Sequence, residues 1–136
     1  MEGRAGPVSE AELEVLKVLW EKGPGTVRVV NAVLRRQGRR WAYTTVQTLL
    51  QRLEAKGHVR SDKSGPAHVY RAAVTRARLL GQRLRDLADQ LCGGAASPLL
   101  LALVEEGRFP PEEIRRLRRL LDELEASPPK KPPRAK

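Results

Sequence analysis

The polar side chains between Trp41 and Gly57 have the residue types and spacing for a chemical role. Hydroxyls, amides and one guanidinium occupy one side of an expected helix, and apolar residues at i, i+3, i+4 and i+7 occupy the other. Solvated faces are usually rich in Glu and Lys, whereas this mixture suits contact with base edges and phosphates. The alternative is that this polar face is an ordinary solvated helix face without a ligand. We predict a recognition helix that contacts DNA through Thr44, Thr45, Gln47, Thr48, Gln51 and Arg52.

Six further side chains flank this helix or follow it in the sequence, and we expect them to contact the DNA backbone or the minor groove. They are Arg39, Arg40, Tyr43, Arg60, Lys63 and His68. A solvated loop or hairpin tip is the alternative for these residues. The aromatic residues Trp20, Trp41 and Tyr70 lie among apolar residues, so they are expected to pack in a core rather than to stack on bases.

Two helices are predicted before the recognition helix. Ser9 and Glu12 have the spacing of a capping box, which opens a first helix that ends at Gly23-Pro24-Gly25. Thr26 is a suitable N-cap for a second helix that runs to about Gln37.

A hairpin is predicted after the recognition helix, which Gly57 should end. Residues 58–63 and 67–73 have the composition of two strands around a Ser64-Gly65-Pro66 turn. Three helices and a two-stranded wing together predict a winged helix-turn-helix. The fold class is therefore mainly α with a small β wing.

The C-terminal half has the pattern of three more helices. The first runs from Arg76 to Leu91, the second opens with Ser97 as N-cap and Pro98 in its first turn, and the third begins at Pro110-Pro111. The segment 99–104 is apolar at every position, so this short helix is expected to be buried on all sides. Three short helices cannot form a large core alone, yet they carry more exposed leucines than a monomer would tolerate. We therefore expect two chains to associate through these helices. The expected dimer contacts are Leu80, Leu84, Leu87, Leu91, Leu99, Leu100, Leu103, Ile114, Leu117, Leu121 and Leu124.

The distribution of charge supports this division of the chain. The net charge is +10, and residues 22–60 hold nine Lys and Arg against one acid, Glu54, which indicates a polyanionic partner. Residues 76–126 are balanced, and the tail carries four basic residues and no acidic ones. We therefore expect a DNA-binding domain at 1–75, a helical dimerisation region at 76–126 and a disordered basic tail at 127–136.

The order and spacing of these segments resemble the BlaI/MecI/CopY family of penicillinase repressors. The matching segments are SEAELEVLKVLWEKGPGTV, WAYTTVQTLLQRLEAKG, GPAHVY and SPLLLALVEEGRFPPEEIRRLRRLL, between about Val8 and Glu125. The resemblance implies a repressor whose N-terminal winged helix binds a palindromic operator and whose C-terminal helices join two chains. In many members a membrane-bound sensor protease cleaves the repressor, which makes such a protease a candidate partner.

At two functional sites of the family, this sequence departs from the pattern of some members. Staphylococcal members are cut at an Asn-Phe bond, and Ala102-Leu103 stands at the corresponding position, so cleavage there is not expected. The copper-responsive branch carries a cluster of C-terminal cysteines, whereas this chain has a single cysteine, Cys92, so copper sensing of that kind is not expected. A structural Cys92 near a dimer seam is the preferred interpretation.

The remaining composition excludes several classes of protein. His58, His68 and Cys92 are too few and too scattered for a zinc site or a catalytic constellation, so we expect no enzyme activity, metal or other cofactor. No signal segment or apolar run of roughly 18 residues is present, so a cytoplasmic protein without direct membrane association is expected.

The leading hypothesis is a homodimeric transcriptional repressor on an inverted-repeat operator, with derepression by a signal that acts on the dimerisation region. The two recognition helices are expected roughly 34 Å apart or at another geometrically allowed spacing. A winged-helix module for protein–protein interaction is one alternative, and the basic balance of residues 22–60 argues against it. A ligand- or redox-gated DNA-binding regulator is the other, although the sequence supplies no convincing polar pocket.

Overall fold

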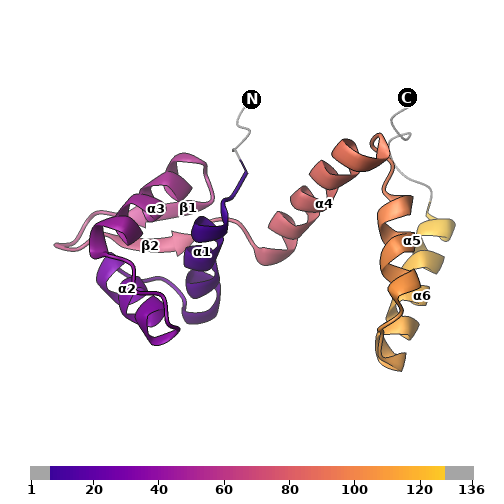
Figure 1. The fold of residues 1–136 in the computed structure, drawn as a ribbon, viewed down its shortest axis with the longest axis horizontal. Coiled ribbons are helices and arrows are strands. Elements are labelled where there is room, and N and C mark those ends of the chain that lie inside the picture. The colour runs from indigo at the N-terminus through magenta and orange to yellow at the C-terminus, as the bar shows by residue number, and fades with distance from the viewer. Residues whose placement is uncertain (1–6, 128–136) are drawn as a thin grey trace. The chain divides into compact units, whose positions relative to one another are not determined.

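The structure is a computed structural model that describes residues 7–127. This part of the chain contains α1 (Glu10–Lys22), α2 (Val27–Arg36), α3 (Tyr43–Ala55), β1 (Val59–Asp62), β2 (Val69–Ala72), α4 (Arg76–Cys92), α5 (Ser97–Glu106) and α6 (Pro111–Ala126), as Figure 1 shows. It divides into two compact units at Leu79–Leu80, inside α4. The boundary expected from the sequence lies four residues earlier, at the start of this helix. The predicted disordered tail lies, except for Ser127, outside the described residues.

The first two helices begin at the predicted caps. The Ser9 hydroxyl accepts from the Glu12 amide at 3.1 Å, and the Glu12 carboxylate accepts from the Ser9 amide at 3.0 Å, which completes the capping box. The Thr26 hydroxyl accepts from the Val29 amide at 3.2 Å. Gly23 ends α1 with φ of 89°, a conformation that suits glycine because it has no Cβ. Both predicted helices are confirmed.

The core of the first unit lies between α1, α2 and α3. The predicted apolar stripe of α3, Val46, Leu49, Leu50 and Leu53, is buried against residues of the other two helices. Tyr70 is buried in the same core, and Trp20 and Trp41 are half-buried against it, as predicted. This packing of one face of α3 leaves its polar face directed away from the core.

The predicted hairpin is present and joins the helices through one further contact. β1 and β2 pair antiparallel with Val59 opposite Ala72 and Asp62 opposite Val69. The Gly25 and Tyr70 backbones exchange two hydrogen bonds of 2.9 and 2.8 Å. The turn between α1 and α2 is therefore held to β2, so the sheet and the helices form one packed unit.

Trp20 anchors the start of α4 to this unit. Its indole Nε1 donates to the Val74 carbonyl at 2.8 Å, and the Arg76 guanidinium lies 5.2 Å from the centre of its ring, within cation–π range. Leu79 is buried in the same core, with 6% of its surface exposed. The first turn of α4 is thus part of the winged-helix core.

The second unit contains the rest of α4, α5 and α6, and the predicted N-cap of α5 is wrong. Ala96, not Ser97, is the N-cap, and Ser97 is the first helical residue. In a single chain none of the residues of α5 is buried, and Leu101 is 59% exposed. The expected burial of this helix on all sides therefore stays a prediction that depends on a second chain.

The described residues contain neither a membrane-spanning helix nor a metal-binding cluster. None of their helices is by itself long and apolar enough to span a membrane; α4 and α5 reach that length only together, and the chain bends by 100° between them. No group of three or more His, Cys, Asp or Glu side chains within residues 7–127 has the arrangement of a metal site.

Candidate nucleic-acid interface

The polar face of α3 is the centre of the candidate interface. Thr44, Thr45, Thr48, Gln51 and Arg52 are exposed, and Gln47 is half-buried at the border of the core. All six predicted side chains therefore lie on the surface or at its edge, on one helix. Hydroxyl, amide and guanidinium groups in this arrangement can bond to base edges when the helix lies in a major groove.

The N-terminus of α3 differs from those of α1 and α2. Its N-cap is Ala42, and no side chain caps it, whereas Ser9 and Thr26 cap the two other helices. The first backbone N–H groups of a helix have no partner within the helix, and with the helix dipole they favour a phosphate. Sequence reasoning missed these donors, and the missing Ser, Thr, Asp or Asn at position 42 is the signal that could have revealed them.

Two arginines precede α3, and one of them, Arg39, interacts with other side chains of the chain. Both Arg39 and Arg40 are exposed. Arg39 Nη2 lies 3.6 Å from the Glu14 carboxylate, and its guanidinium lies 5.8 Å from the centre of the Trp41 ring. Arg39 thus has partners within the chain on α1 and in the turn before α3. Tyr43, in the first turn of α3, is 49% exposed.

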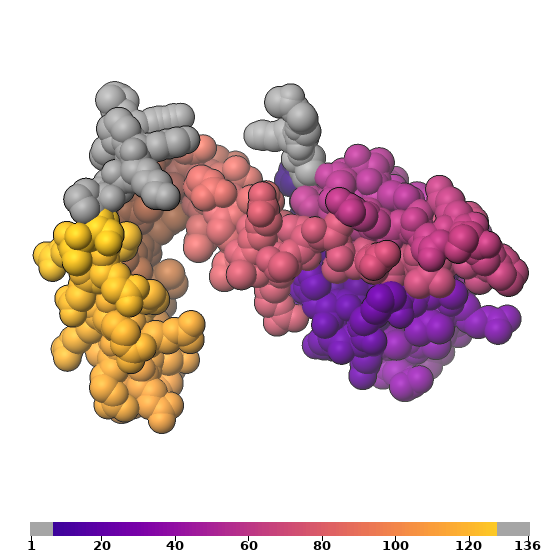
Figure 2. Space-filling view, turned by 180° about the vertical axis from the view of Figure 1, so that it is seen from behind, coloured from indigo at the N-terminus to yellow at the C-terminus, as the bar shows by residue number. Residues whose placement is uncertain are grey.

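The wing carries one more exposed basic residue than the three predicted contacts Arg60, Lys63 and His68. Arg60, Lys63 and His68 are exposed, and the loop between the strands projects beyond the helices and forms an edge of the surface (Figures 1 and 2). The register places Arg60 directly opposite Arg71, which is also exposed. Like charges in this position destabilise a hairpin, and a polyanion relieves the repulsion. Arg71 was not among the predicted contacts; only the strand register reveals its position.

The single acid of residues 22–60 has a partner within the unit. The Ser61 hydroxyl donates to the Glu54 carboxylate at 2.5 Å and joins the last turns of α3 to β1. At the wing, Asp62 accepts from the Ser64 hydroxyl at 2.7 Å and from the Ser64 amide at 2.9 Å. These two hydrogen bonds, with the Arg71 charge, outweigh the effect of desolvation and hold the pKa of Asp62 below its ordinary value.

A buried carboxylate lies beneath the C-terminal end of α3. Glu12 is 1% exposed, and its Oε1 lies 2.7 Å from Lys56 Nζ. Burial by itself raises the pKa of Glu12, but the hydrogen bonds from Lys56 and Ser9, with the charges of Lys56 and Arg52, outweigh burial and leave the pKa lowered. Glu12 is therefore an ionised group that links α1 to the end of α3.

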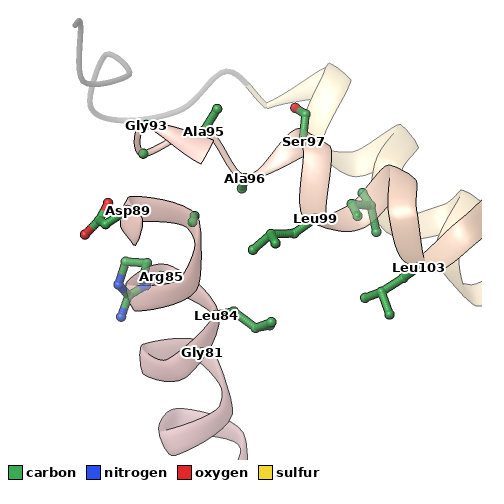
Figure 3. Close-up of a pocket in the computed structure, with 13 residues that line it drawn as sticks. Gly81, Leu84, Arg85, Asp89, Gly93, Ala95, Ala96, Ser97, Leu99 and Leu103 are labelled. Atoms are coloured by element: carbon green, nitrogen blue, oxygen red, sulfur yellow. The ribbon is translucent and has the colours of Figure 1, made fainter. Parts of the chain in front are cut away.

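The second unit presents an apolar surface. Most of the predicted dimer contacts are exposed in the single chain, among them Leu80, Leu84, Leu87, Leu91, Leu100, Leu103, Ile114, Leu121 and Leu124, while Leu99 and Leu117 are half-buried. A groove of about 1200 Å³ lies between α4 and α5, and Leu84 and Leu99 point into the space between these helices, as Figure 3 shows. Arg85 and Asp89, which also line the groove, are on the other side of α4.

This fold and its surface define a class of protein. Three helices with a β wing, a polar helix face and an excess of basic residues describe a winged-helix DNA-binding protein. The structure is similar to a solved DNA-binding domain of the repressor BlaI, with a TM-score of 0.50 and 32% identity over 56% of this chain and 92% of that one.

The particular family follows from the sequence comparisons. The penicillinase repressor family model matches residues 8–123. The transcriptional regulator BlaI of Mycobacterium tuberculosis is 37% identical over 93% of this chain and 91% of its own length, and the penicillinase repressor of Bacillus licheniformis is 28% identical over 85% and 90%. The chain belongs to the penicillinase repressor family, and it is a DNA-binding transcriptional repressor. The family resemblance seen in the sequence is confirmed.

Proposed function

We propose that this repressor binds an inverted-repeat operator in double-stranded DNA as a homodimer. In this proposal α3 lies in the major groove of each half-site, and Thr48 and Arg52 bond to base edges. The uncapped N-terminus of α3 binds a phosphate, and Arg60, Arg71 and Lys63 of the wing contact the DNA backbone. The exposed polar face of α3, beside a basic wing, is the observation that carries this proposal.

The proposed homodimer rests on the apolar surface of the second unit. Twelve large apolar side chains of α4, α5 and α6 are each at least 39% exposed, which is more than an isolated soluble chain tolerates. A second copy supplies the same surface, so a two-fold dimer covers both. The dimerisation region is thus proposed to lie within residues 76–126.

Derepression is proposed to act through this second unit, where the signal breaks or displaces the dimer seam. Loss of the dimer removes the gain of two linked half-sites, a factor of about 100 to 10,000 in affinity. A sensor protease is one source of the signal. Ala102-Leu103 stands at the position of the Asn-Phe bond cut in staphylococcal members, so we propose that any cleavage occurs at another bond.

Selection of bound fragments from genomic DNA tests the operator. We expect an inverted repeat, which Arg52→Ala and Thr48→Ala bind more weakly than the wild type, while Arg78→Ala on α4 binds as the wild type does. Diffuse binding without a repeat, unchanged in all three variants, would contradict the proposed reading helix.

A chain truncated at Gly94 tests the second part of the proposal. It retains the winged helix and α4 but lacks α5 and α6. We expect it to bind a single half-site with the affinity of the intact chain and to lose most of its affinity for the full operator. Full-operator affinity equal to that of the intact chain would exclude a requirement for the removed helices.

A further inference from the structure

The buried carboxylate of Glu12 lies among donors from two segments. Its Oε1 accepts from the Ser9 amide at 3.0 Å and from Lys56 Nζ at 2.7 Å. The same ammonium group donates to the Pro7 carbonyl at 2.8 Å. Two acceptors near the start of α1 therefore hold the Lys56 ammonium, and only 27% of the Lys56 side chain is exposed.

Lys56 would otherwise extend the charged side of α3. It follows Arg52 by four residues and Thr45 by eleven, so the helical repeat places all three positions on the same side of α3. A free lysine at this position would add a flexible point charge that neutralises a phosphate without selecting a base. Its bond to Glu12 directs that charge into the protein.

Arg52, one of the proposed base-reading residues, also lies near Glu12. The Arg52 charge lowers the pKa of Glu12, so the two groups lie within electrostatic range of each other. Arg52 is exposed and therefore accessible to DNA, whereas Lys56 is hydrogen-bonded to the protein. The buried Glu12 carboxylate thus holds Lys56 away from DNA, while the neighbouring Arg52 remains available to it.

We propose that Glu12 is a positioning residue that holds the C-terminal end of α3 and withholds Lys56 from DNA phosphates. The repressor then loses one sequence-independent contact, while the contacts that read bases are retained. The inference rests on the proposed function in one respect, namely that α3 is the helix that reads the operator.

The salt dependence of DNA binding distinguishes this role from a merely structural one. In Glu12→Gln the amide keeps the shape of the side chain and an oxygen that accepts from the Ser9 amide, but it lacks the charge that holds Lys56. We expect the slope of log K against log salt on random-sequence DNA to steepen by about 0.9, the value for one added phosphate contact. Between 50 and 200 mM salt this corresponds to an additional loss of affinity of about threefold.

Two further variants identify the source of the change. Glu10→Gln removes an exposed acid from the same first turn of α1 and changes the net charge equally, so its slope should remain that of the wild type. Glu12→Gln combined with Lys56→Met should return the slope to the wild-type value, and Lys56→Met alone should leave it unchanged. Lys56→Met keeps the test informative if Glu12→Gln unfolds.

Three outcomes would overturn the proposal. An unchanged slope in folded Glu12→Gln shows that Lys56 is not released toward DNA, and a slope that stays steep in the double variant assigns the added contact to another group. A slope reduced by about 0.9 in Lys56→Met alone shows that Lys56 already contacts a phosphate in the wild type. Failure of the operator proposal can be distinguished from failure of this one. The wild type would then prefer no inverted repeat, while the salt slopes of the wild type and the variants on random-sequence DNA could still be compared.

Discussion

Arg52 combines a charge with a planar pair of donors, and only the second property can select a base. Arg52→Lys keeps the charge but lacks the two-pronged hydrogen bond to a guanine edge. We expect operator affinity to decrease by about 1 to 3 kcal/mol, a factor of roughly 5 to 150, with an unchanged salt slope. Titration of labelled operator at several salt concentrations measures both quantities. Arg78→Lys, on α4, serves as the control, and equal operator affinity for Arg52→Lys would argue against base contact.

Glu12 makes the stability of the winged helix depend on pH in the acid range. Its pKa in the folded chain is below the ordinary value of 4.5, so ionised Glu12 stabilises the fold above that pH. The contribution is lost as the pH falls through the lowered pKa. We therefore expect the free energy of unfolding to decrease on acidification below about pH 4.5, and to decrease less in Glu12→Gln. Urea unfolding at a series of pH values measures the difference, and parallel curves for both proteins would contradict it.

At the scale of elements, Trp20 links the first turn of α4 to the winged helix. Trp20→Phe keeps an aromatic ring against the core but loses the hydrogen bond to the Val74 carbonyl. We expect a loss of about 0.5 to 1.5 kcal/mol in stability and faster hydrogen exchange at the amides of Arg78 and Leu79. Trp41→Phe is the matched control, because Trp41 lies in the turn before α3 and should not affect these amides. Unchanged exchange in Trp20→Phe would show that the indole does not anchor α4.

The helices and the wing could be predicted because their signals are local. Ser9, Glu12 and Thr26 cap helices from within three residues, and the buried stripe of α3 repeats along one helix. Contacts between distant residues could not be predicted in the same way. The Trp20 hydrogen bond spans 54 positions and the Lys56–Glu12 bond 44, and no local pattern specifies either pair.

In the candidate site, too, local patterns could be predicted and contacts between distant residues could not. The polar residues of α3 are exposed or lie at the border of the core, as the helical period required. Arg71 was missed because only the strand register places it opposite Arg60. The exposure of α5 in a single chain has another cause, since an apolar segment predicts that its residues will be covered but does not identify the chain that covers them.

At the scale of the whole molecule, the exposed leucines of α6 should determine whether two chains associate. Leu124 is 66% exposed, and Leu124→Asp introduces a charge whose burial at an apolar seam is unfavourable. We expect a monomer in analytical ultracentrifugation, unchanged affinity for a half-site and full-operator affinity about 100 to 10,000 times weaker.

The control for this variant is Arg119→Ala, which changes the net charge by the same amount at another position of α6. It should remain dimeric and bind the full operator as the wild type does. A dimeric Leu124→Asp with normal operator affinity would place the seam elsewhere than on this part of α6.

The second unit buries almost no side chain within one chain, and this affects how the repressor responds to its own abundance. A helical region that gains its core only by association follows mass action, so its folded fraction rises with the number of copies, while that of the winged helix does not. In the proposed dimer, the apolar helices of the two chains would protect one another at high abundance, whereas at low abundance they would be exposed to degradation. The proposed dimer surface would thus make repression a threshold response to the supply of protein.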